Sequence, residues 1–205
     1  MSQIKLRFIE AIQSAIAPVF GASLTVGDKL TDVFSKIQGL LASKTNRAVI
    51  TANVTGGDSS TSDIDILSYT IPAGYQQLGD TYRCKINGAV TKPLSAGTTV
   101  SFWLKIETTK AISVTFTPTA TMTNLPCDIE FTICTRSVST TGTLAITARG
   151  TLMAGAATNI TIIPIGVSAT NIDTTAAMAV TIGFVFSNSN ASNKVQAFTA
   201  EIMEV

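Results

Sequence analysis

The sequence contains no histidine and little charge. Of its 205 residues, 14 are Lys or Arg and 13 are Asp or Glu, so charged residues make up 13% of the chain, against about 25% in an ordinary soluble domain. Without histidine, the chain lacks the commonest general base and the commonest metal ligand. It also contains no Gly-x-Ser-x-Gly motif and no phosphate-binding glycine loop. These absences argue against an enzyme.

The few charges and cysteines exclude further classes of protein. The formal net charge is +1 and the basic residues are scattered, so no nucleic-acid partner is expected. Cys84, Cys127 and Cys134 are odd in number and form no Cys-x-x-Cys pair. We therefore expect buried, reduced thiols rather than a zinc site or a disulfide framework. No apolar run approaches the ~20 residues that span a bilayer, so no membrane insertion is expected.

Apolar residues make up 45% of the chain, and Thr, Ser, Ala and Gly fill much of the remainder. This composition suits β-sheets whose outer faces carry hydroxyl groups, and it argues against disorder. We predict a mainly β protein with two parts. Residues 1–45 are expected to be an N-terminal helical segment for oligomerisation or attachment, and residues 46–205 a β-sandwich head domain.

The N-terminal segment has the apolar spacing of a coiled-coil seam. The apolar positions recur at alternating intervals of three and four residues in two runs: Ile9, Ile12, Ile16 and Val19, then Val26, Leu30, Val33, Ile37 and Leu40. Pro18 and Gly21 disfavour one unbroken helix. The pattern predicts two short helices, roughly 3–17 and 26–42, the second starting at a capping-box-like Thr25 to Asp28.

Short helices of this kind are marginal in water unless their apolar stripe is buried. The stripe either packs on the β-domain of its own chain or meets copies of itself. Isoleucine at both kinds of seam position favours three or more strands over two. We therefore expect self-association of three or more chains, with intrachain packing as the alternative.

From residue 46 the periodicity changes to that of strands. The predicted strands are 48–55, 64–71, 81–90, 99–107, 112–118, 128–135, 143–149, 158–165, 178–187 and 195–203. Turn residues separate them, and further breaks are expected at Asn87-Gly88 and at Pro126. Short alternating strands with no helix between them predict an antiparallel β-sandwich, most consistent with a jelly roll. Two smaller immunoglobulin-like sandwiches are the alternative, although no linker divides the region.

Two stretches are similar to bacteriophage proteins. GDKLTDVFSKIQGLL (27–41) resembles a helical segment of phage tail-fibre and head-fibre proteins. The matching positions are Gly27, Asp28, Leu30, Lys36, Ile37 and Gln38, whereas Lys29, Phe34 and Gly39 depart from the pattern. ILSYTIPAGYQQLGDTYRCKINGAV (66–90) looks like the opening strands of phage fibre and capsid-decoration heads, through Tyr69, Ile71, Pro72, Ala73, Leu78, Gly79 and Asp80.

The resemblance implies a trimeric virion component, either a fibre or spike subunit or a capsid-decoration protein. It implies self-association and contact with other capsid or tail proteins of the particle. It also implies a projecting head, and it leaves open whether that head binds a glycan or protein of the host surface or binds nothing. The competing expectation is a secreted bacterial adhesin or lectin-like carbohydrate-binding module with the same sandwich.

Candidate sites are few. Asp58, Asp63 and Asp65 lie in one Ser-rich turn and could supply oxygens to calcium, but aspartates are also common turn formers. Asp128 and Glu130 form an acid pair of the kind that cleaves glycosidic bonds, although an i, i+2 pair usually marks one solvated strand face. We expect no catalytic residue, no bound metal and no cofactor.

The aromatic residues offer two candidate contacts. Trp103 and Tyr75 each carry a flat apolar ring with a polar edge, which suits contact with a carbohydrate or a partner. Trp103 falls out of phase with the apolar residues of its predicted strand, and Tyr75 falls in a predicted loop. Ordinary packing is the alternative for both.

Overall fold

The computed structural model describes residues 47–57, 60–93, 98–155 and 158–205. Residues 1–46 lie outside the described residues. The two predicted helices and their seam from Ile9 to Leu40 therefore stay predictions, and so does the self-association expected from them.

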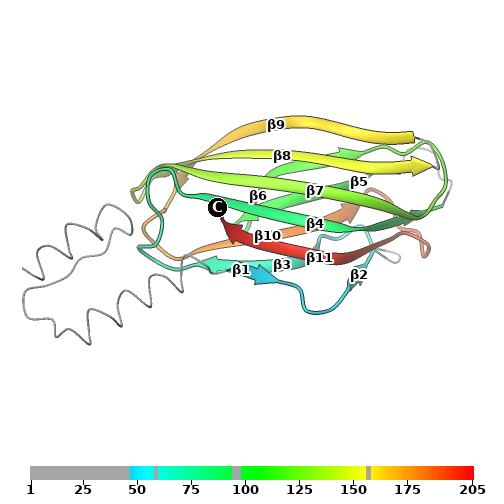
Figure 1. Cartoon of the computed structure of the whole chain (residues 1–205), viewed down its shortest axis with the longest axis horizontal. Coiled ribbons are helices and arrows are strands. Elements are labelled where there is room, and N and C mark those ends of the chain that lie inside the picture. The colour runs from blue at the N-terminus through cyan, green and yellow to red at the C-terminus, as the bar shows by residue number, and fades with distance from the viewer. Residues whose placement is uncertain (1–46, 58–59, 94–97, 156–157) are drawn as a thin grey trace, which may run out of the picture. The chain divides into compact units, whose positions relative to one another are not determined.

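The described residues form strands only, arranged in two antiparallel sheets (Figure 1). The strands are β1 (Arg47–Val49), β2 (Val54–Gly56), β3 (Ile64–Ile71), β4 (Thr81–Lys92), β5 (Val100–Ile106), β6 (Thr109–Phe116), β7 (Met122–Ser137), β8 (Gly142–Gly155), β9 (Thr158–Ile172), β10 (Met178–Phe186) and β11 (Lys194–Glu204). The seven-stranded sheet has the order β1-β11-β4-β7-β8-β9, with β2 also paired to β11. The four-stranded sheet has the order β3-β10-β5-β6.

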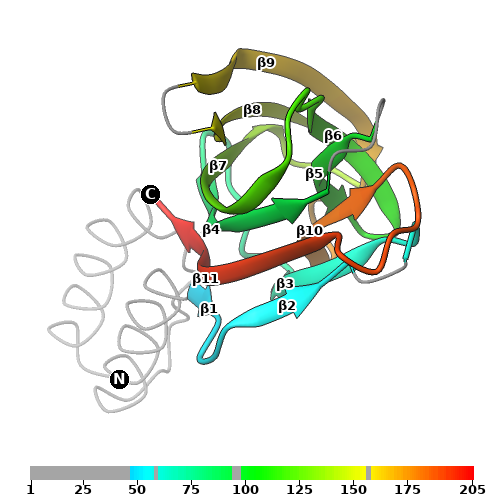
Figure 2. The same ribbon diagram turned by 90° about the vertical axis from the view of Figure 1, so that its right-hand side faces the viewer.

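The strand pairs are nested along the chain, which is the topology of a jelly roll. β5 pairs with β6, β4 with β7, β3 with β10 and β1 with β11, all antiparallel. β8 and β9 are an added hairpin that extends the seven-stranded sheet beyond β7. Figure 2 shows the two sheets from the side. The predicted antiparallel, jelly-roll-like sandwich is confirmed, and the described strands make one sandwich rather than two immunoglobulin-like ones.

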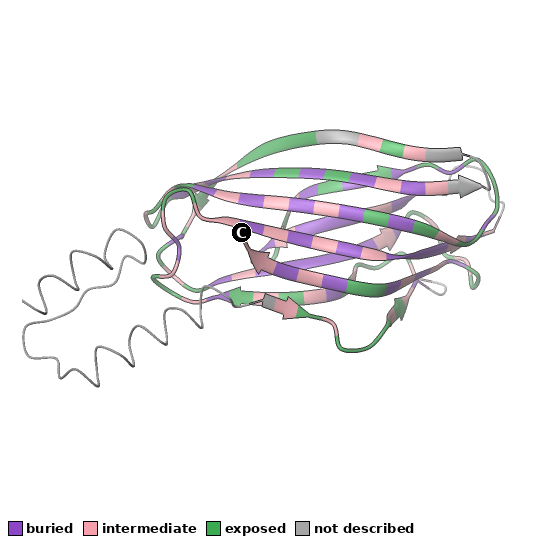
Figure 3. Cartoon of the chain, viewed as in Figure 1, coloured by how far each residue is buried: buried purple, intermediate pink, exposed green. Residues whose placement is uncertain are grey.

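Alternating side chains build the core, as the sequence indicates. On β7, Ile129, Phe131 and Ile133 are fully buried, while Glu130 and Thr132 face outward. The same alternation appears as striped colouring along β4, β7 and β8 in Figure 3. Antiparallel sheets with one face against a core show this pattern because successive side chains point to opposite faces.

Aromatic residues fill the interior of the four-stranded sheet. Phe102 on β5 meets Phe116 on β6 edge-on, with ring centroids 6.2 Å apart. Phe184 and Phe186 on β10 are also edge-on, at 6.0 Å. Such pairs contribute about 0.5–1.5 kcal/mol beyond their buried area. They make the four-stranded sheet the more aromatic side of the core.

Two expected breaks were wrong, because both lie inside strands. Gly88 belongs to β4, where the absence of a side chain allows a close approach of β11. Pro126 belongs to β7 opposite Ala89, but β8 begins to pair with β7 only at Cys127. A proline without an N–H is tolerated there because β7 has one partner strand at that point.

The seven-stranded sheet is wider than the sheet it packs on, and β9 forms its outer edge. Ile165 and Val167 on β9 lie opposite Ala148 and Ile146, which face the core. The two β9 side chains therefore point to the inner side, yet they are 39% and 41% exposed. The four-stranded sheet ends at β6 and leaves this part of β9 partly uncovered.

Candidate functional site

A β-bulge on β11 places an aromatic ring on the outer face of the seven-stranded sheet. The register between β11 and β4 runs Ala197 opposite Gly88, then Thr199 opposite Asn87, so Phe198 is the extra residue. Ala197 is buried, whereas the Phe198 side chain is 49% exposed. A bulge of this kind reorients a side chain without breaking the sheet.

Gly88 makes this close approach of the two strands possible. A Cβ atom at Gly88 would lie 2.3 Å from the carbonyl oxygen of Gln196 and 3.1 Å from the Cα of Ala197. Real Cβ atoms essentially never come so close to a backbone atom, so only glycine fits beside the bulge. The glycine and the bulge together position Phe198.

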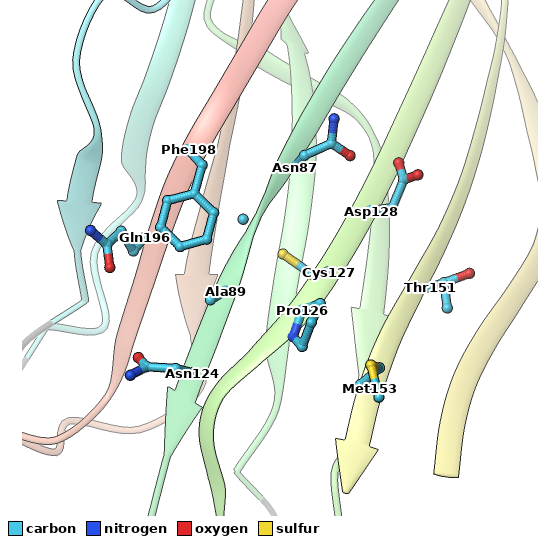
Figure 4. A pocket seen from close by; sticks show the side chains of 11 residues that line it. Asn87, Ala89, Asn124, Pro126, Cys127, Asp128, Thr151, Met153, Gln196 and Phe198 are labelled. Atoms are coloured by element: carbon cyan, nitrogen blue, oxygen red, sulfur yellow. The ribbon is translucent and has the colours of Figure 1, made fainter. Parts of the chain in front are cut away.

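Phe198 forms one side of a shallow groove of about 660 Å³ (Figure 4). The floor crosses β4 at Ala89 and continues to β7 and β8. The apolar lining comes from Phe198, Pro126 and Met153. The polar lining comes from Asn87, Asn124, Asp128, Thr151 and Gln196. The groove therefore combines one aromatic ring with amide, carboxylate and hydroxyl groups.

Two of these polar side chains are held in place by hydrogen bonds. The Asn87 Nδ2 donates to Thr199 Oγ1 at 3.2 Å. The Asn124 Oδ1 accepts from Thr91 Oγ1 at 3.1 Å, and the Asn124 backbone N–H donates to the same hydroxyl. Asn124 has a left-handed φ of 50°, a conformation that asparagine tolerates better than most residues. Both amides keep donors and acceptors for another molecule.

The other polar groups of the groove have no internal partner. Within the part of the chain that the structure describes, Asp128, Thr151 and Gln196 make no side-chain hydrogen bond or ion pair. Their hydrogen-bonding capacity is available to solvent or to a ligand.

A row of alternating charges runs beside the groove. Glu201, Lys85, Glu130 and Arg149 lie opposite one another on β11, β4, β7 and β8. Arg149 Nη2 binds Glu130 Oε1 at 2.8 Å. Opposite charges at directly opposed positions attract each other across strands. Lys85, Glu130 and Arg149 line a second hollow of about 360 Å³, which shares Asp128 and Thr151 with the groove.

Asp128 and Glu130 both lie on the outer face of β7, as expected for an i, i+2 pair on a strand. Glu130 is engaged by Arg149, while Asp128 lies in the groove. The two carboxylates thus have different surroundings.

Trp103 also lies on an outer face, that of the four-stranded sheet, but it is fully buried. Its ring covers Gly183 on β10 and lies beneath Lys105, whose Nζ is 4.2 Å from the ring centroid. Lys110 approaches the same ring at 5.6 Å. The indole Nε1 has no hydrogen-bond partner in the described structure. The predicted ligand contact of Trp103 stays a prediction, and it requires the two lysines to move.

Two aspartates of the predicted turn hold these lysines. Asp63 binds Lys105 at 3.1 Å and also binds Lys110, and Asp65 lies 3.9 Å from Lys105. Burial acts to raise the pKa of Asp63, but the hydrogen bonds and charges of Lys110 and Lys105 outweigh it, and the pKa lies below its usual value. Asp58 lies outside the described residues, so the three-carboxylate calcium hypothesis stays untested.

Tyr75 is half-buried in the loop between β3 and β4 and packs against the core. Its backbone N–H donates to the carbonyl oxygen of Pro72 at 3.3 Å. Neither Tyr75 nor Trp103 lines the groove, so the structure does not bring the two predicted contacts together there.

The three cysteines are free thiols, with Cys84 and Cys127 buried and Cys134 half-buried. Burial raises the pKa of Cys84 and raises that of Cys127 to about 12. A raised pKa suppresses the reactive thiolate. Cys127 lies at the base of the groove, where it acts as a small apolar side chain.

Sequence reasoning did not identify Phe198, although a signal was present. The buried positions on β11 are Val195, Ala197, Ala200 and Ile202. The step of three from Ala197 to Ala200 breaks the period of two, and such a break indicates a bulge. With the bulge recognised, Phe198 becomes the exposed aromatic residue of that strand.

Comparisons with known proteins do not identify a family. No family model and no curated protein matches the chain. Among solved structures, the chain is similar to the VP2 subviral particle of infectious bursal disease virus, with 10% identity and a TM-score of 0.33. That alignment covers 79% of this chain and 33% of VP2. It is also similar to a legume lectin-like domain from Entamoeba histolytica, with 9% identity, a TM-score of 0.29, and coverage of 90% of this chain and 100% of that domain.

Proposed function

We propose that this chain is a non-enzymatic structural subunit of a virus particle, a fibre, spike or decoration protein that self-associates and projects its jelly roll. Jelly rolls are a recurrent architecture of viral capsid and lectin domains. Fold alone does not determine function, so the fold supports the proposal only as an analogy. The resemblance of residues 27–41 and 66–90 to phage fibre and decoration proteins supports the viral setting.

The observation that carries self-association is the exposed inner side of β9. Ile165 and Val167 belong to the core-facing side of the sheet, but they remain about two-fifths exposed. Beside them, β9 and β6 are both edge strands, and edge strands can pair with another chain. Fully burying an Ile or Val side chain contributes roughly 1.5–3 kcal/mol. We call the exposed pair Ile165 and Val167 the β9 strip. A neighbouring copy of the chain that covered this strip would bury the apolar surface that the four-stranded sheet leaves exposed.

The strip and the N-terminal seam support the same assembly independently. The predicted seam favours three or more helices, and a head with an uncovered edge is suited to lie beside equivalent heads. We therefore propose a homotrimer that contacts other capsid or tail proteins of the particle.

Sedimentation equilibrium of the full chain tests self-association. The unmodified protein is expected to sediment as a trimer. Val167→Lys places a charge on the strip and is expected to weaken the assembly at least tenfold. Thr147→Lys, at an exposed position on the outer face of β8, is the matched control and should leave it unchanged. A monomer at high concentration would contradict the proposal.

The viral setting has its own test, which is mass spectrometry of purified particles from the source of the gene. Recovery of the protein at a fixed copy number per particle supports the proposal. Absence of the protein from such particles, together with its secretion by a bacterial cell, supports the alternative of an adhesin or lectin-like module. The groove beside Phe198 favours this alternative, because it combines an aromatic ring with polar side chains.

A further inference from the structure

We propose that the groove beside Phe198 binds a neutral saccharide. The inference rests on the proposed function, because a head that projects from a particle is exposed to glycans on a host surface.

The aromatic ring supplies the apolar half of the recognition. Phe198 is 49% exposed and lies on a bulge that Gly88 permits. Phe198 is not among the residues of the hydrophobic core, and Figure 4 shows its ring beside the groove on β11. One face of a pyranose ring carries several C–H groups and is apolar. That face can lie on a phenyl ring, whose surface is electron-rich.

The amides supply the polar half. Vicinal sugar hydroxyls each donate and accept, and so do side-chain amides. Asn87, Asn124 and Gln196 bring three amides to one groove. The hydrogen bonds that Asn87 and Asn124 make to threonine hydroxyls orient these two amides before any ligand arrives. Preorganisation reduces the ordering cost of binding.

Charge selects a neutral sugar. Asp128 is the one charged side chain among the described lining residues of the groove. A carboxylate accepts hydrogen bonds from hydroxyls but repels acidic sugars such as sialic acids. In the hollow that adjoins the groove, Arg149 pairs with Glu130. An anionic ligand would therefore find no free positive charge among the lining residues.

The same location disfavours an extended peptide. Peptides commonly bind to sheets by adding a strand at an open edge. At the groove, β11 is paired with β2 and β4, and β4 is paired with β11 and β7. The backbones of Gly88, Ala89, Gln196 and Ala197 are already paired on both sides, which leaves recognition at these positions to side chains. The mixed lining described above suits a saccharide.

A glycan array probed with the full chain tests the inference. The probes are neutral oligosaccharides of glucose, galactose, mannose, N-acetylglucosamine and N-acetylgalactosamine, with sialylated counterparts for charge. Binding to a neutral probe is expected. Phe198→Ala should weaken it at least tenfold, Phe198→Tyr should retain it, and Gln196→Ala should weaken it without touching the ring.

Leu78→Ala is the matched control, because Leu78 is a 73% exposed apolar side chain away from the groove. It should leave binding unchanged, and unfolding midpoints establish that each variant is folded. Binding to no neutral probe, binding only to sialylated probes, or undiminished binding by both Phe198→Ala and Gln196→Ala would each overturn the inference. None of these results bears on particle composition, so the proposed function would fail separately.

Discussion

Gly183 and Trp103 lie directly opposite each other on β10 and β5, and the indole ring occupies the space that a side chain at Gly183 would need. A Cβ atom there would lie 2.4 Å from Cζ2 of the ring and 2.2 Å from the carbonyl oxygen of Ile64. The register between β10 and β3 also shifts at this glycine. The tryptophan is thus buried on an outer face because its neighbour has no side chain.

Gly183→Ala is expected to destabilise the fold by about 1–3 kcal/mol, the usual cost of overpacking. The backbone oxygen cannot rotate away as a side chain can, so the strand itself must shift. Trp103 is the sole tryptophan, and its fluorescence during urea unfolding measures the change. Gly166→Ala is the control, because its nearest atoms would be 3.6 Å away. It should change stability by less than about 0.5 kcal/mol.

Asp63 makes part of the stability depend on acid pH. Because its folded pKa is lowered, its contribution is present above the unfolded pKa of about 3.9. That contribution is lost as pH falls through the folded value. Asp63→Asn should therefore lower stability at pH 7 by up to about 1 kcal/mol, since the pair is partly exposed. The difference from the unmodified chain should shrink in urea titrations below pH 4. Asp65→Asn, at a more exposed carboxylate, should show a smaller effect.

The thiols should differ sharply in reactivity. Cys84 and Cys127 are buried with raised pKa values, and their thiolates are scarce at pH 8. Cys134 is half-buried. Ellman's reagent is expected to modify one thiol per folded chain and three after unfolding in urea. Cys134→Ser should abolish the reaction of the folded chain. Rapid modification of Cys84 or Cys127 in that variant would contradict the described burial.

The bulge predicts an unusual tolerance of deletion. Removing Phe198 leaves Ala197 inward, Thr199 outward and Ala200 inward, which restores regular alternation on β11. Removing Thr132 from the regular strand β7 instead turns Ile133 outward, because a shift of one residue reverses the faces. We expect the first deletion to lower the urea midpoint but leave folded protein. The second should abolish soluble expression. Equal damage by both would show that the bulge carries essential packing.

Most strands are predictable because alternation reports which face is buried. Val100, Phe102, Leu104 and Ile106 are buried on β5 as their spacing indicates. The nested pairing is harder to predict, because alternation identifies faces but not partners. The predicted strand 48–55 is divided into β1 and β2, which both pair with β11, since exposed residues 51–53 separate them.

The candidate site was predicted less well than the fold. Trp103 is an out-of-phase aromatic residue on its strand, but Lys105 on the same strand and Lys110 on β6 lie over its ring. Asp63, from an earlier segment of the chain, holds both lysines there, and this contact depends on the fold rather than on the local sequence. Phe198 was missed although the spacing from Ala197 to Ala200 marked its bulge. An interval of three residues between buried positions of a strand indicates a bulge, and this interpretation identifies Phe198.

The position of the late strands has a consequence for biosynthesis. β10 lies between β3 and β5, and β11 lies between β1 and β4, so each sheet lacks an interior strand until residues 178–204 are made. A ribosome adds about 5–20 residues per second, and the aromatic interior of the nascent chain stays incompletely paired until these residues have been added. The head is therefore expected to fold only after β10 and β11 have been synthesised, because these two strands join the strands on either side of them.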